Sequence, residues 1–456
     1  MWPILHSTRP PGYDRRCLRA LAALAVLAAF GGPVGAAHAN VVVYGTVLGP
    51  GGDPDIARID TTTGAITRLG ASVNTGAREA GSALSPDGLL LAYERGPRDR
   101  AAIMVTNLST GATASVVDAF DVQALHPAQP AWTASSHLLL GVAAAPQNGV
   151  LMDRLLDVDL TNLPNGPFPR TTRILGPAGP DDFLTNSPAE AQVPGVAAPV
   201  DVAIGRGLSS HGAVVGQHTT APATVPEGDS AHPTISSAVG VVVFMFAPSG
   251  TSPSRLQFTD LGATASLPAI VNAPGADEQL PQFSPDGRYL AFIRAAAGER
   301  RLFVWDTSSQ LLLNSTGVKL DPPVSAAGAS TPFEQRALDG LSVRVEQSVF
   351  ASALIASRGL IVIRTVLPSR VGIIVQKVVG RTKVLGRNAV KLRYVGRVPL
   401  GSFHAGRSTI HWDLHVAGRR LAAGRYQVTP RSLTAKGGIR DLGKPVVITI
   451  PSHEAR

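Results

Sequence analysis

Short apolar runs, separated by polar turns that contain glycine, recur along the first two thirds of the chain. Ser85-Pro86-Asp87-Gly88 precedes the apolar run 89–93, and Ser284-Pro285-Asp286-Gly287 precedes the apolar run 289–293. Proline presets φ for a turn, aspartate can bond to the nearby backbone, and glycine accepts the positive φ at which the next strand starts. Each copy therefore predicts a hairpin between two strands.

Each copy continues into a second strand and a further polar hairpin, so one repeat has about 40 residues, the length of a four-stranded propeller blade. Weaker copies lead from Val41, Trp132 and His232, and a poorer one covers 193–217. Ten prolines between Leu163 and Gly228 predict long loops there. We count six units between Asn40 and Leu320. They predict an all-β fold with a six-bladed β-propeller, and seven blades are the alternative.

A different pattern begins after 321–331, whose prolines, serines and small residues are typical of a linker. Seven segments there alternate or are rich in β-branched residues: Leu341–Gln347, Leu360–Leu367, Val371–Val379, Ala389–Val395, Thr409–Val416, Arg425–Thr429 and Val446–Ile450. Short strands separated by turns in this way are typical of a β-sandwich. We therefore expect a propeller over 40–320 and a small sandwich over 332–456.

The first residues resemble an export signal. Arg15, Arg16 and Arg19 precede the apolar run Ala20–Phe30, and Ala37-His38-Ala39 follows a Gly/Pro break. This order predicts a signal peptide over 1–39, with a buried N-terminal helix as the alternative. The apolar run is shorter than the roughly 20 residues that span a bilayer. Both general secretion and twin-arginine export stay open. We expect a bacterial protein that is secreted, periplasmic or associated with the cell envelope.

Two stretches resemble known families. The turn and apolar strand at 283–292, with the second copy at 82–93, resemble the TolB-like, WD-type propeller repeat of exported bacterial proteins. This resemblance covers most of 40–320 and implies a β-propeller with a protein-binding role. The stretches 405–413 and 418–426 resemble the Ig-like domain of the flagellar hook-cap protein and C-terminal modules of exported actinobacterial proteins. That resemblance implies no activity.

Charge separates the two predicted domains. The net charge of the whole chain is +9, but residues 40–320 carry −8, residues 321–456 carry +14 and the leader carries +3. The 47 glycines and 36 prolines argue against a mostly helical protein. The only cysteine is Cys17, within the leader, so the mature chain would contain no disulfide.

Catalytic and metal-binding motifs are missing from the sequence. It contains no Gly-x-Ser-x-Gly, His-Glu-x-x-His, EF-hand or Walker pattern. Of the clustered histidines His404, His411 and His415, the last two would lie about 13 Å apart on one strand face, too far to share a metal. The acidic pairs Asp157/Asp159 and Asp181/Asp182 lack the spacing of a cation-binding loop. We expect no cofactor, no metal and no catalysis.

A basic cluster is the candidate binding site: Arg381, Lys383, Arg387, Lys391, Arg393 and Arg397. Lys391 and Arg393 would share one face of a strand. Such a cluster suits an anionic partner, for example teichoic acid, acidic lipid headgroups or extracellular DNA. Aromatic residues are too few nearby for sequence-specific recognition of nucleic acid. A solvated surface and an intramolecular contact with the acidic propeller are the alternatives.

These features predict an exported propeller scaffold that binds proteins or envelope polymers as a monomer, with peripheral contact to membrane or wall. The alternative is a hydrolase or lyase of envelope glycans or peptides with an active site in the propeller, because a fold alone does not determine function. Clustered Asp, His and Arg in the central channel would favour the enzyme, and small residues would favour the scaffold.

Overall fold

The structure is a computed structural model. It describes residues 38–49, 52–97, 101–117, 124–133, 137–147, 150–160, 170–173, 184–191, 193, 200–206, 213–216, 229–248, 252–260, 264–320, 341–347, 349–433 and 439–452. Regular structure in these residues consists of β-strands, which confirms the all-β class. No helix in these ranges is long and apolar enough to cross a membrane. The predicted leader up to residue 37 and the predicted linker lie outside the described residues.

Five antiparallel sheets follow one another along the chain, each with its strands in chain order. The first contains β4 (Glu79–Leu84), β5 (Leu90–Arg95), β6 (Ala102–Asn107) and β7 (Thr113–Val117). The second contains β8 (Ala124–Trp132), β9 (His137–Gln147), β10 (Val150–Asp159) and β11 (Arg170–Arg173). The third contains β12 (Leu184–Ala191), β13 (Val200–Arg206) and β14 (Ala213–Gly216).

The fourth and fifth sheets lie closest in sequence to the predicted linker. The fourth contains β15 (Asp229–Ile235), β16 (Val242–Ala247), β17 (Arg255–Thr259) and β18 (Thr264–Ser266). The fifth contains β19 (Asp277–Phe283), β20 (Tyr289–Ala296), β21 (Glu299–Asp306), β22 (Leu311–Leu312) and β23 (Val318–Lys319). The first strands of these two sheets contain His232 and Leu280, where the sequence predicts the start of a repeat unit.

A further sheet joins distant parts of the chain. Its strands are β24 (Leu341–Gln347), β1 (His38–Leu48), β2 (Pro54–Asp60) and β3 (Ile66–Arg68), paired in that order. Val43 of β1 lies opposite Val343 of β24. The assignment of Leu341–Gln347 to the C-terminal sandwich was therefore wrong for this strand. An alternating apolar strand has the same sequence pattern in either domain, and only its pairing partner distinguishes them.

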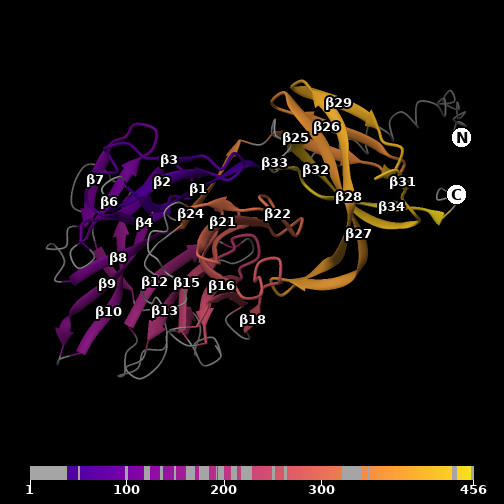
Figure 1. Cartoon of the computed structure of the whole chain (residues 1–456). Helices are drawn as coiled ribbons and strands as arrows, with labels where there is room; N and C mark the ends of the chain where they lie inside the picture. The colour runs from indigo at the N-terminus through magenta and orange to yellow at the C-terminus, as the bar shows by residue number, and fades with distance from the viewer. Residues whose placement is uncertain are drawn as a thin grey trace, which may run out of the picture.

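The first strands of these sheets form a ring. β4, β8, β12, β15, β19 and β24 contact one another in that order, and β24 contacts β4 again. The sheets therefore stand around a common axis, which is the arrangement of a β-propeller (Figure 1). In the described residues, strand β24 lies between β19 and β4 and closes the ring.

Apolar side chains fill the space between neighbouring sheets. Met245, Leu256, Phe292, Phe303 and Trp305 belong to one buried cluster between the fourth and fifth sheets. The Phe292 and Phe303 rings stack with their centroids 5.7 Å apart. A sheet buried on both faces needs apolar residues at successive positions, which explains the continuous apolar runs.

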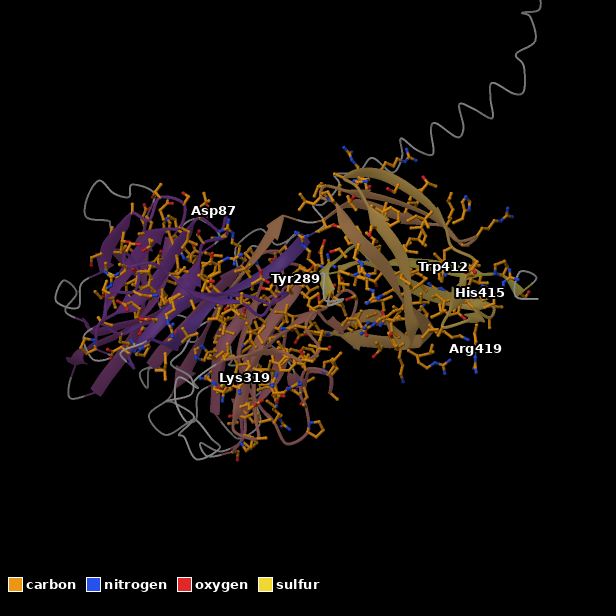
Figure 2. All side chains as sticks on the ribbon, turned by 45° about the horizontal axis from the view of Figure 1, so that its top comes forward. Asp87, Tyr289, Lys319, Trp412, His415 and Arg419 are labelled. Atoms are coloured by element: carbon orange, nitrogen blue, oxygen red, sulfur yellow. The ribbon has the colours of Figure 1, made fainter. Side chains whose placement is uncertain are left out.

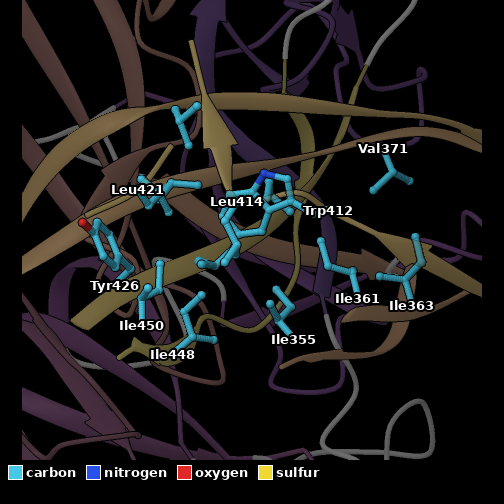
Figure 3. Packing of buried hydrophobic residues seen from close by; sticks show 14 of the residues in the cluster. Ile355, Ile361, Ile363, Val371, Trp412, Leu414, Leu421, Tyr426, Ile448 and Ile450 are labelled. Atoms are coloured by element: carbon cyan, nitrogen blue, oxygen red, sulfur yellow. The ribbon is translucent and has the colours of Figure 1, made fainter. Parts of the chain in front are cut away.

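The C-terminal module has two layers. One sheet contains β25 (Phe350–Ile355), β26 (Leu360–Thr365) and β29 (Gly406–His411). The other layer contains β27 (Ser369–Val384), β28 (Arg387–Phe403), β32 (Gly424–Leu433), β33 (Ile439–Leu442) and β34 (Val446–Ile450). Through β33 it is continuous with the sheet of β1, β2, β3 and β24. A short hairpin of β30 (His415–Val416) and β31 (Arg419–Arg420) stands beside them. Buried residues from both sheets, among them Ile361, Val371 and Tyr426, form the core between the layers together with Trp412, which follows β29 (Figure 3).

Three strands of this module differ clearly from their predicted bounds. The predicted strand Thr409–Val416 ends at His411, because Leu414 adopts a φ of 63° and the chain turns there. β27 and β28 extend well beyond the predicted segments and form one long hairpin. The hairpin contains polar and charged residues on both faces towards its tip, so apolar alternation does not show its full length.

Candidate binding surface

The first Ser-Pro-Asp-Gly turn is held by its own side chains. The Ser85 hydroxyl donates to Oδ1 of Asp87 at 2.6 Å and accepts the N–H of Leu90 at 2.8 Å. The N–H of Gly88 donates to the Ser85 carbonyl at 2.8 Å. Gly88 has a φ of 73°, the left-handed conformation that glycine accepts without strain. The side chains of this turn therefore have a structural role in the repeat.

The second turn also contacts the neighbouring sheet. The Ser284 hydroxyl donates to Oδ1 of Asp286 at 2.5 Å. The hydroxyls of Ser236 and Ser237 donate to the carbonyls of Gly287 and Pro285 at 3.0 and 2.7 Å. Gly287 has a φ of 68°, and a Cβ there would lie 2.5 Å from the backbone nitrogen of Ala238. This turn thus fixes the fifth sheet against the fourth.

Arg288, directly after this turn, connects the propeller with the C-terminal module. Its Nη2 lies 2.8 Å from Oδ2 of Asp306 and 3.4 Å from the carbonyl oxygens of Leu442 and Gly443. Burial alone would raise the pKa of Asp306, but the Arg288 guanidinium keeps that pKa below its ordinary value. Figure 2 shows the neighbouring Tyr289 where the two parts of the molecule meet. A buried ion pair therefore supports this contact.

The six predicted basic residues all lie on the β27–β28 hairpin, and all are exposed. Lys391 lies opposite Gly380, and Arg393 lies opposite Lys377. Residues opposite each other, or two apart on one strand, share a face of the sheet. Lys391 and Arg393 therefore share one face. Arg381 lies opposite Val390, and with Lys383 it belongs to the other face.

The cations of this hairpin have no carboxylate partners in the described part of the chain. None of Arg381, Lys383, Arg387, Lys391, Arg393 and Arg397 takes part in an ion pair there. Elsewhere in the described residues, arginines such as Arg78, Arg294 and Arg301 do pair with glutamates. The positive charge of the hairpin is therefore available to an anionic group from another molecule.

The tip of the hairpin docks on the propeller. Leu385 and Gly386 have φ values of 49° and 74°, which matches a two-residue type I′ turn. Leu385 is buried in the apolar cluster between the fourth and fifth sheets. The Arg387 guanidinium donates to the Val239 carbonyl at 2.9 Å, and the Gln310 amide donates to the Val390 carbonyl at 3.0 Å. Among the described residues, one buried apolar side chain and two hydrogen bonds to backbone carbonyls thus hold the hairpin tip on the propeller.

The clustered histidines are exposed at the surface of the C-terminal module. His411 ends β29 and His415 begins β30, so they do not share one strand as predicted. Nδ1 of His415 lies 3.1 Å from Oδ2 of Asp413. Figure 2 shows His415 near Trp412 and Arg419, away from the propeller.

The acidic pair Asp157/Asp159 lies beside a histidine that the sequence did not single out. Nδ1 of His137 is 3.0 Å from Oδ1 of Asp157, and Nε2 is 3.6 Å from Oδ1 of Asp159. In the described residues, no group of three or more His, Cys, Asp or Glu side chains is arranged to hold a metal. Asp181 and Asp182 lie outside the described residues.

A recurring asparagine, absent from the predicted site residues, ties loops to the sheets. Asn74 accepts the N–H of Ile56 at 2.9 Å and donates to its carbonyl at 3.0 Å. Asn272 makes the same two bonds with Leu256, at 2.8 and 2.7 Å. Asn314 accepts the N–H of Val304. In each case an aliphatic residue precedes the asparagine and a glycine follows two or three positions later, a sequence signal for this repeat.

Polar residues of the inner strands bond to one another. The Ser342 hydroxyl on β24 donates to the Ser82 carbonyl on β4 at 3.1 Å. On β19, the Gln279 amide donates to Oδ2 of Asp277 at 2.7 Å. His232 lies on β15 and is half-buried. Burial of its imidazole ring lowers the pKa of this histidine to about 4. The bond between Ser342 and Ser82 thus joins two neighbouring strands of the ring, and the bond between Gln279 and Asp277 orders side chains along one of them.

Comparisons with known proteins concern the fold. No protein-family model and no curated protein matches the chain. It is similar to the solved structure of TolB from Acinetobacter baumannii, with 16% identity, 65% of this chain and 67% of that chain covered, and a TM-score of 0.43. It is also similar to a putative TolB from Agrobacterium tumefaciens, with 13% identity, 69% of this chain and 100% of that chain covered, and a TM-score of 0.37. An oligogalacturonate lyase in complex with manganese is similar too, with 11% identity, 72% of this chain and 80% of that chain covered, and a TM-score of 0.33.

Proposed function

We propose that this chain is an exported, six-bladed β-propeller protein of the bacterial cell envelope that binds an anionic polymer and has no catalytic activity of its own. The predicted signal peptide over 1–39 supports export. The TolB-like repeat supports a protein-binding role for the propeller. The polymer site is the β27–β28 hairpin.

The observation that carries this proposal is the set of exposed, unpaired cations on that hairpin. The base of the hairpin belongs to the core of the C-terminal module, and its tip belongs to the core of the propeller. The cations between them are thus presented on a backbone held at both ends. A preordered surface loses little conformational entropy when a ligand binds.

Binding of the full chain to polyacrylate, measured across salt concentrations, tests the polymer site. Changing Arg381, Lys383, Lys391 and Arg393 to glutamine removes four exposed cations from the hairpin. We expect affinity at low salt to fall at least tenfold, about 1.4 kcal/mol. We also expect a weaker dependence of affinity on salt, because fewer counterions are displaced from the polymer.

The matched control removes the same charge elsewhere in the C-terminal module. Its four substitutions to glutamine are at the exposed residues Arg364, Arg407, Arg419 and Arg425, none of which lies on β27 or β28. This control should keep most of the affinity and most of the salt dependence. Equal losses in the two variants would show that net charge alone, and not the hairpin, determines binding. Absence of binding by the unaltered chain at low salt would contradict the proposed function.

A further inference from the structure

The outer face of the sheet formed by β25, β26 and β29 is a second exposed surface of the C-terminal module. Phe350, Ile361 and Ile363 of this sheet are buried in the core of the module. Their neighbours along β26, Val362 and Arg364, therefore point to the opposite face, because successive side chains of a strand alternate. Val362 is half-buried and Arg364 is exposed, so this face reaches solvent. Figure 1 shows β26 and β29 at the top of the module, away from the labelled strands of the propeller.

Two arginines lie directly opposite each other on this face. Arg364 of β26 is in register with Arg407 of β29, and both are exposed. Like charges opposite each other in a sheet repel and destabilise it. Neither arginine takes part in an ion pair in the described part of the chain, and β25, β26 and β29 contain no Asp or Glu. An anionic group that contacts both guanidinium groups would relieve the repulsion.

Aliphatic side chains lie beside this pair of arginines. In the next row of the face, Leu354 lies opposite Val362, and Val362 lies opposite Thr409. Leu354 is 62% exposed, the highest value for a large apolar side chain in the described residues. Val366, directly after β26, is 37% exposed. The outer positions of a sheet that covers a core on one side are ordinarily polar. Packing within the described chain therefore does not explain Leu354.

We propose that this face docks on the surface of an anionic lipid bilayer. We call it the Arg364 face and define it by Leu354, Val362, Arg364, Arg407 and Thr409. The two arginines bind phosphate groups of the lipid headgroups, because a guanidinium group matches the oxygens of a phosphate. Leu354 enters the boundary between headgroups and acyl chains, where an aliphatic side chain leaves water. The inference goes beyond the proposed function, because it concerns a different face and a different ligand from those of the hairpin.

The size and composition of the Arg364 face favour a bilayer over other anionic partners. Its three strands have six residues each. They extend about 10 Å across the sheet and about 17 Å along it. This area is far below the roughly 800 Å² that each partner buries in a specific protein interface. A hydrophilic anionic polymer would leave Leu354 in water. A lipid surface matches both parts of the face, because it presents phosphate groups next to hydrocarbon.

Co-sedimentation of the full chain with vesicles, at about 0.15 M salt, tests the Arg364 face. The unaltered chain should bind vesicles of equal parts phosphatidylglycerol and phosphatidylcholine, and it should not bind vesicles of phosphatidylcholine alone. R364Q/R407Q should weaken binding to the anionic vesicles about thirtyfold, because each cation near such a surface contributes about fivefold. The control R419Q/R425Q removes two exposed cations elsewhere in the module. It should weaken this binding by no more than about threefold, since salt screens charges that lie farther from the lipid.

The aliphatic part of the face has a separate test. L354N keeps every charge and should weaken binding to the anionic vesicles about fivefold, because a leucine side chain then no longer leaves water. V447N is the matched control and should leave this binding unchanged, because Val447 is 42% exposed but lies on β34 in the other layer. In L354W, brominated phosphatidylglycerol should quench the fluorescence of the ring at position 354, since that ring would lie beside the acyl chains.

The outcomes separate this inference from the proposed function. Unchanged binding of R364Q/R407Q to the anionic vesicles would overturn the Arg364 face as the bilayer contact. Equal losses in R364Q/R407Q and R419Q/R425Q, or in L354N and V447N, would overturn it too, because the position of the residue would then not matter. Self-association of the full chain that L354N abolishes would overturn it in favour of a second copy.

Polyacrylate distinguishes a failure of this inference from a failure of the proposed function. R364Q/R407Q should keep its affinity for polyacrylate, because the polymer site is the hairpin. If the vesicle test fails and polyacrylate binding still depends on the hairpin, only the Arg364 face is overturned. If polyacrylate does not bind and the vesicle results are as expected, only the proposed polymer site is overturned.

Discussion

Single polar residues hold the propeller to the C-terminal module. Arg288 forms a buried ion pair with Asp306 and also reaches two carbonyls of the module. Asp306 further accepts the Ser308 N–H at 2.9 Å, at the start of its hairpin. Because its carboxylate is fully buried, this aspartate depends on the guanidinium to remain charged.

Removal of Arg288 should destabilise the propeller. In R288A the buried Asp306 carboxyl group loses its partner and either stays charged without compensation or takes up a proton, so the unfolding free energy should fall by about 3–5 kcal/mol. Chemical denaturation followed by tryptophan fluorescence, to which the buried Trp305 contributes, measures this change. In a D306N background the same arginine substitution should have a much smaller effect. Equal effects in the two backgrounds would show that the two residues are not coupled.

At the scale of elements, the β27–β28 hairpin both carries the basic residues and docks on the propeller. Leu385 adopts a positive φ, which is rare for a residue with a branched side chain, and it is buried. The apolar contact compensates for this conformation. Leu385 is therefore the buried apolar anchor of the hairpin tip, beside the hydrogen bonds of Arg387 and Gln310.

L385N should undock the tip of the hairpin without disrupting its turn, because asparagine accepts the left-handed conformation. Amide hydrogen exchange should accelerate at 236–241 of the propeller and at the hairpin tip, since both lose the apolar contact. L354N is the matched control, because Leu354 of the same module is 62% exposed. Unchanged exchange in L385N, or an equal change in the control, would contradict this role of Leu385.

The sequence predicts elements well where the local pattern determines them. The Ser-Pro-Asp-Gly turns have the φ values and bonds that their residues imply. Leu341–Gln347 is a strand as predicted, but its partner β1 lies about 300 residues away, and no local pattern records such pairing. The basic residues of the β27–β28 hairpin were predicted one by one, but the contact of its tip with the propeller was not, because Leu385 meets the fourth and fifth sheets only in the folded chain.

At the scale of the whole molecule, closure of the ring joins both ends of the propeller sequence. β24 pairs with β1 and contacts β4 and β19. One further pair, Ala39 with Asp441, extends the sheet of β1 into the C-terminal module. The Asp441 carboxylate accepts the Val349 N–H at 3.1 Å, close to the end of β24. The propeller and the module are therefore connected at the strand that completes the ring.

Truncation separates the role of β24 from that of the module. A chain of residues 38–320 lacks β24 and should aggregate, because the inner edges of β1 and β4 lose their neighbour. A chain of residues 38–347 retains this strand and should unfold cooperatively, although at a lower temperature than the full chain. Thermal unfolding followed by circular dichroism compares them. Similar cooperative unfolding of the two chains would show that β24 is dispensable for closure.

If the chain is exported from its N-terminus, as proposed, the pairing of β1 with β24 also orders events in time. Val41, Val42 and Val43 leave the membrane first, but the strand that covers their inner edge follows only after the rest of the propeller. Until then β1 presents an unpaired apolar edge, the kind of edge that joins other chains. Export before folding therefore requires protection of this edge during transit, whereas export of an already closed ring does not.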